Sequence, residues 1–77
     1  MPMAKLWWRS LEEFERDLKG ATDPRVHEMR DWAEAQERSA DEPGMGRNPR
    51  ARRQFRQMRD AGDAELDRRG LLWPESR

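Results

Sequence analysis

The sequence has no cysteine, no isoleucine and no tyrosine among its 77 residues. Without cysteine, neither a disulfide framework nor a thiolate metal site can form, which removes the usual stabilising links of small secreted folds. Only Thr22 and Val26 are β-branched, so residues that favour strands are nearly missing, whereas Ala, Glu, Arg, Leu, Met and Gln dominate. The composition predicts an all-α protein and fits a reducing cytoplasm best.

Long apolar segments are missing as well. No run approaches the roughly 18 apolar residues of a membrane span. The first eight residues also lack the apolar stretch of about 7–15 residues that a secretion signal requires. We therefore expect a cytoplasmic chain with no membrane span.

Large apolar side chains are few. The hydrophobic share is 34% and the charged share 42%, against roughly 45–50% and about 25% in an ordinary globular chain. A chain of this length supports one small domain, residues 1–77, with a thin core. Such a chain usually gains stability from a partner or from self-association, so a larger protein or a homo-oligomer is expected.

Charge is balanced overall but divided into blocks. Sixteen basic and sixteen acidic residues give a net charge of zero, so no long-range field of one sign attracts a partner. Residues 11–42 carry 5 basic and 11 acidic groups, whereas residues 43–59 carry six arginines and no acid. The sequence therefore places an acidic half beside a basic helix.

A first helix is predicted over residues 11–19. Ser10 and Glu13 form the capping-box spacing at its start, and Gly20 supplies a stop. A second helix is predicted over residues 24–38, with Asp23 as its cap and Pro24 in its first turn. The expected core stripes of these two helices are Leu11, Phe14 and Leu18, followed by Val26, Met29, Trp32, Ala33 and Gln36.

Residues 41–47 combine one proline and two glycines without periodicity, which predicts a linker loop. Asn48 and Pro49 then begin a third helix over residues 49–69, which Gly70 ends. Gly62 lies inside this helix and leaves a break near that residue as an alternative. The expected core stripe comprises Ala51, Phe55, Met58, Gly62 and Leu66. The whole is a small three-helix bundle with irregular, Trp-bearing termini.

The arginine-rich segment 47–59 is the sharpest local feature. Its guanidinium groups could clamp phosphates, with Gln54 and Gln57 as base-edge contacts, as in a nucleic-acid-binding helix. Alternatively, the acidic residues of the first two helices neutralise them within the fold or a dimer, which the balanced composition favours. A third alternative is that the same arginines bind an acidic protein surface.

Four tryptophans in 77 residues is a high number, and three of them lie in the terminal segments: Trp7, Trp8 and Trp73. Either the two chain ends pack beneath the helices and close the core, or their indoles anchor in pockets of a partner. Both can hold at once. Trp32, on the stripe of the second helix, is expected in the core.

The remaining polar residues show no pattern typical of a catalytic or metal-binding site. His27 is the single histidine, and its spacing from Asp23 does not define a metal or acid–base pair. Four carboxylates cluster at residues 60–67 without the spacing of a calcium loop. With no set of nucleophile, base and orienting residue, we expect no enzyme activity, no metal and no cofactor.

The segment Trp8-Arg9-Ser10-Leu11-Glu12-Glu13-Phe14 resembles the start of the iron-sulfur/molybdopterin-type subunit of bacterial alternative respiratory complexes. A twin-arginine export motif follows in that family, and Arg52-Arg53-Gln54-Phe55 lies in the same order here. The family's apolar export segment and cofactor ligands are missing. The resemblance implies at most a small accessory piece of an electron-transfer assembly.

These features together predict a non-catalytic accessory subunit or adaptor that docks on a larger protein. A nucleic-acid-binding regulator that uses residues 49–59 is the alternative, and an inhibitor of a larger machine is the third. The predicted partner-binding residues are Trp7, Trp8, Leu71, Leu72, Trp73, Arg50, Arg52, Arg53, Arg56 and Arg59.

Overall fold

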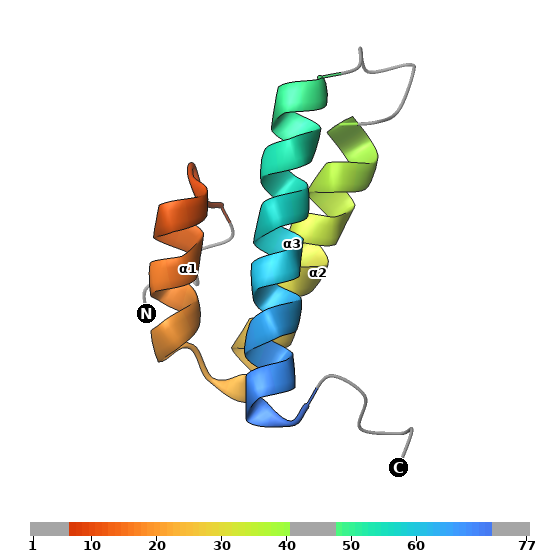
Figure 1. Ribbon diagram of the computed structural model, residues 1–77. Coiled ribbons are helices and arrows are strands. Elements are labelled where there is room, and N and C mark those ends of the chain that lie inside the picture. The colour runs from red at the N-terminus through yellow and green to blue at the C-terminus, as the bar shows by residue number, and fades with distance from the viewer. Residues whose placement is uncertain (1–6, 41–47, 72–77) are drawn as a thin grey trace, which may run out of the picture.

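The computed structural model describes residues 7–40 and 48–71. These ranges contain three helices and no strand: α1 (Leu11–Gly20), α2 (Asp23–Ala40) and α3 (Pro49–Arg69) (Figure 1). The predicted all-α fold is confirmed, and each helix begins and ends within two residues of its predicted bounds. The predicted linker at residues 41–47 lies outside the described residues.

The start of α1 follows the predicted capping chemistry. The Ser10 hydroxyl accepts the Glu13 backbone N–H at 3.1 Å, and the Glu13 carboxylate accepts the Arg9 N–H at 2.8 Å. The first bond satisfies a donor that the first turn of a helix leaves open, whereas the second goes to the residue before the Ser10 cap instead of to the Ser10 N–H of a standard capping box. Gly20 is the last helical residue, and Ala21 turns the chain into an extended conformation.

The start of α2 corrects one prediction. Asp23 is the first helical residue rather than the cap, and the Thr22 hydroxyl accepts the Arg25 N–H at 3.4 Å. At α3 the Asn48 side chain accepts the Ala51 N–H at 3.1 Å, as predicted. Gly70 ends α3 in the left-handed region, at a φ of 76° that suits glycine.

α3 packs against both other helices. Figure 1 shows that α1 and α3 run in the same direction. α2, which lies between them in the sequence, runs in the opposite direction. The stripes predicted from spacing supply the core, and Trp8 joins them, but five of their members are only half-buried: Leu11, Trp32, Gln36, Ala51 and Phe55. The buried apolar residues are Trp8, Phe14, Leu18, Val26, Met29, Ala33, Met58 and Leu66. No helix in the described part of the chain is long and apolar enough to cross a membrane.

α3 is continuous through Gly62, so the alternative of a break there is not realised. Gly62 is buried against α2, and a Cβ built on it would lie 2.8 Å from the Arg30 Cβ. The missing side chain therefore allows the two helices to cross closely. Beside this crossing, Arg30 Nε donates to Asp63 at 2.8 Å and Arg30 Nη1 to Glu34 at 3.0 Å.

Arg69 connects the ends of all three helices. Its guanidinium donates to the Asp23 carboxylate at 2.8 Å, to the Leu18 carbonyl at 3.2 Å and to Glu65 at 2.7 Å. Glu65 also accepts hydrogen bonds from Arg68. These bonds, first from Arg68 and then from Arg69, hold the pKa of Glu65 below its usual value.

Candidate protein-binding surfaces

Trp7 is the one large hydrophobic side chain that is exposed among the residues the structure describes, at 57%. Its ring meets Trp32 edge to face, with centroids 5.8 Å apart, and Trp32 meets Phe55 in the same way at 5.7 Å. Trp32 and Phe55 are half-buried and pack against the core. A row of three aromatic rings thus runs from α3 across α2 to the surface.

Trp8 corrects the prediction of a surface anchor. Its side chain is 2% exposed, and its indole N–H donates to the Asp17 carboxylate at 2.7 Å. The Arg25 guanidinium lies 5.3 Å from the ring centroid, in cation–π range. Because both its ring and its N–H are occupied, Trp8 packs into the core, as the first alternative expected for the N-terminal end of the chain.

The other predicted terminal residues are at or beyond the end of α3. Leu71 is half-buried, packs against the core, and donates its N–H to the Leu66 carbonyl at 2.8 Å. Leu66 lies 11 residues after Phe55, or about 16 Å along the helix. Leu71 is therefore distant from the Trp7 row. Leu72 and Trp73 lie outside the described residues.

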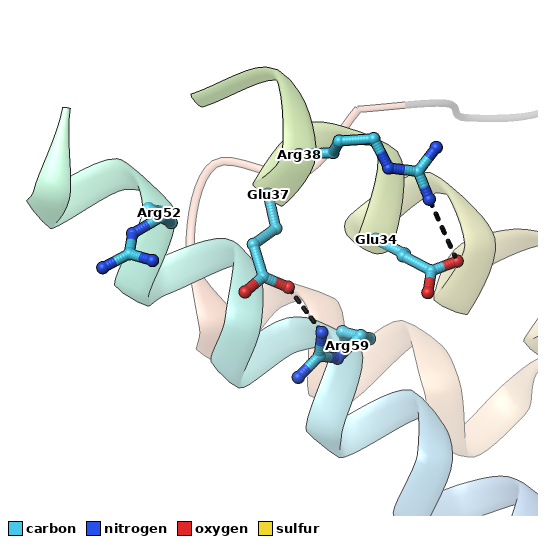
Figure 2. A pocket seen from close by; sticks show the side chains of 5 residues that line it. All are labelled: Glu34, Glu37, Arg38, Arg52 and Arg59. Atoms are coloured by element: carbon cyan, nitrogen blue, oxygen red, sulfur yellow. Dashed lines mark hydrogen bonds and ion pairs between the residues drawn. The ribbon is translucent and has the colours of Figure 1, made fainter. Parts of the chain in front are cut away.

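Glu37 neutralises two of the five predicted arginines. Its carboxylate accepts Arg56 Nε at 3.0 Å and Arg59 Nη1 at 2.7 Å, and its side chain is only 13% exposed. Figure 2 shows Glu37 reaching from α2 toward α3. Sequence reasoning missed this residue, although Glu37 follows Ala33 at the four-residue spacing of the buried stripe.

A shallow hollow of about 220 Å³ lies at this point between α2 and α3 (Figure 2). Its walls are entirely charged, and Arg38 adds an ion pair of 4.0 Å with Glu34. The lining residues are Glu34, Glu37, Arg38, Arg52 and Arg59. Arg52 is half-buried here rather than on an open face. The ion pairs of Glu37 with Arg59 and of Glu34 with Arg38 place opposite charges in contact along the hollow.

Arg50 and Arg53 remain exposed on the first turns of α3. Neither makes an ion pair with any residue in ranges 7–40 and 48–71. Of the predicted site residues that the structure describes, Trp7, Arg50 and Arg53 are therefore exposed and outside any ion pair with the described residues.

The part of the chain that the structure describes holds no group of three or more His, Asp or Glu side chains suited to a metal ion. His27 is exposed on α2.

The chain matches no protein-family model, no curated protein and no solved structure. The resemblance of residues 8–14 to a respiratory-complex subunit therefore stays a prediction. In the fold, the same residues supply a core indole and the cap of α1.

Proposed function

We propose that this chain is a non-catalytic binding protein, an accessory subunit or adaptor, that docks on a larger protein through Trp7. The observation that carries the proposal is the exposure of this indole beside the half-buried ring of Trp32, which packs against the core. Tryptophan and arginine are the residues that most often dominate the binding energy of protein interfaces.

The contact with Trp32 makes Trp7 suitable as an anchor. An edge-to-face pair contributes about 0.5–1.5 kcal/mol beyond the area that it buries, so it favours one ring orientation before any partner arrives. A side chain that is already oriented loses less conformational entropy on binding. Docking through Trp7 covers apolar surface that the thin core leaves in water.

A nucleic-acid-binding regulator is the second candidate, and exposed Arg50 and Arg53 are the features that favour it. Phosphate affinity depends on the number of uncompensated cations. Glu37 already compensates Arg56 and Arg59, and Arg52 is half-buried, so exposed Arg50 and Arg53 give only a short cationic surface. So small a number of uncompensated arginines favours a protein partner over a nucleic acid. An inhibitor would use the same interface as an accessory subunit, so the proposed docking through Trp7 applies to both roles.

Quantitative affinity purification with tagged wild type and Trp7→Ala tests the proposal. We expect a defined protein to co-purify with the wild type and to fall at least about tenfold with Trp7→Ala, since anchors contribute 2 kcal/mol or more. Arg16→Glu, an exposed change on α1, serves as a control and should retain the partner. Circular dichroism checks that each variant stays folded.

Two results would overturn the proposal. One is recovery of the same proteins with Trp7→Ala as with the wild type. The other is retention on nucleic acid that is lost steeply with rising salt and abolished by Arg50→Glu with Arg53→Glu, which would promote the second candidate.

A further inference from the structure

The outer face of α3 carries one line of exposed residues. Its members recur at alternating spacings of three and four, which places them on a single stripe of the helix. They are Arg50, Arg53, Gln57, Asp60, Ala64 and Asp67, and every one is exposed. The stripe is basic in its first half and acidic in its second half.

The charges at the two ends of this stripe have no partner within the described ranges. Arg50, Arg53 and Asp67 make no ion pair there, whereas Asp60 contacts Arg59 at 3.3 Å. Elsewhere on α3, arginines and carboxylates are drawn into pairs with α2 or with one another. The outer stripe is therefore the part of α3 whose opposite charges are segregated instead of paired.

We propose that this stripe binds a second copy of the chain, with the two α3 helices antiparallel about a two-fold axis. An antiparallel arrangement centred between Gln57 and Asp60 sets Arg50 opposite Asp67 of the second copy. It also sets Arg53 opposite Ala64, and Gln57 opposite Asp60. The two-fold axis repeats each contact, so one surface is complementary to itself.

The surface beside the stripe accommodates Arg53 of the second copy. A hollow of about 390 Å³ between α1 and α3 borders Ala61 and Ala64, whose small side chains allow a close approach. Glu15 lines the same hollow, is exposed, and makes no ion pair within the described ranges. Arg53 of the second copy can lie over Ala64 and reach this carboxylate. This arrangement thus pairs four charged side chains that make no ion pair within the described ranges of one copy: Glu15, Arg50, Arg53 and Asp67.

This inference goes beyond the proposed function and uses another surface. Trp7 packs on Trp32 of α2, whereas the stripe lies on the side of α3 that faces away from the core. Exposed ion pairs are individually weak and screened by salt. We therefore expect a weak, salt-sensitive dimer that can form while Trp7 stays available to another protein.

Sedimentation equilibrium over a concentration series up to roughly 1 mM, where weak association is populated, tests the dimer. Arg50→Glu sets like charges opposite Asp67 at both ends, and Asp67→Arg does the same opposite Arg50. Each alone should lower the association constant at least about tenfold. An equimolar mixture of the two variants should restore association, as should both changes in one chain.

Unfolding of the single variants would not explain a loss of association that is restored when the two variants are mixed. A glutamate at the start of α3 and an arginine at its end both suit the helix dipole, so each single variant should keep its helices. Circular dichroism checks this point. Arg16→Glu is the matched control and should associate like the wild type.

Three outcomes would overturn the inference: a wild type that stays monomeric throughout the series, single variants that associate as well as the wild type, or a mixture that fails to restore association. The result is separable from the proposed function. Trp7→Ala should leave the dimer unchanged, and Asp67→Arg should leave capture of the Trp7-dependent partner unchanged.

Discussion

The close crossing of α2 and α3 predicts that Gly62→Ala destabilises the protein. A Cβ at residue 62 would lie 2.8 Å from Arg30 Cβ, 3.1 Å from Arg30 Cγ and 3.2 Å from Arg30 Cα. Rotation of the Arg30 side chain moves only the Cγ among these three atoms. The helices themselves must therefore separate, which loosens the core between them.

Two opposing effects set the magnitude. Alanine is favoured over glycine in a helix interior by about 1 kcal/mol. Forcing an extra methyl group into a packed interior costs about 1–3 kcal/mol, and the upper part of that range applies because a backbone carbon is among the atoms in conflict. The expected net loss is about 1–2 kcal/mol, and each kcal/mol lowers the Tm of a domain this small by about 4–8 °C.

Urea denaturation followed by circular dichroism measures this loss, and Gly20→Ala is its matched control. Gly20 ends α1, and a Cβ there would meet nothing within 4 Å. We expect Gly20→Ala to be neutral or stabilising by up to about 1 kcal/mol. If Gly62→Ala proved as stable as Gly20→Ala, the steric reasoning about the crossing would be wrong.

Three further predictions concern stability. Trp8→Phe removes the hydrogen bond to Asp17 and should cost about 1.5–3 kcal/mol in denaturant titrations, whereas Trp7→Phe should change stability by less than about 0.5 kcal/mol. Asn48→Ala removes the cap of α3 and should cost about 1 kcal/mol, measured in the same way. Since folding lowers the pKa of Glu65, its contribution to stability is present above the usual carboxyl range and is lost as pH falls through the folded pKa. Glu65→Gln should therefore flatten the fall of Tm below about pH 4.5, and an unchanged slope would contradict this.

The helices were predictable because their signals are local. Ser10 and Asn48 precede their helices at cap spacing, and Gly70 takes the left-handed conformation that ends α3. The start of α2 was misplaced by one residue because both Thr22 and Asp23 can cap a helix. A local pattern cannot choose between two such neighbours, but the resulting error is small.

The candidate surfaces were less predictable because burial depends on tertiary packing. Trp7 and Trp8 are adjacent and chemically identical, yet one is 57% exposed and the other 2%. The difference arises because Asp17 and Arg25, which are distant in sequence, meet the indole of Trp8. The spacing of the arginines likewise did not reveal that Glu37 lies between Arg56 and Arg59.

The zero net charge is better explained by the fold than by the composition. Buried apolar side chains form one small cluster, and around it arginines from α3 reach carboxylates of α2, as at Glu37, while Arg30 of α2 reaches Asp63 of α3. Exposed pairs of this kind add little stability singly. They nevertheless join particular faces of the two helices, because Arg56 and Arg59 of α3 share one carboxylate of α2 and Arg30 of α2 reaches Asp63 of α3. An arginine that pairs with α2 in this way is less available to a ligand. Among the described arginines of α3's first turns, exposed Arg50 and Arg53 make no ion pair with a described residue and are therefore the ones we expect a second molecule to contact.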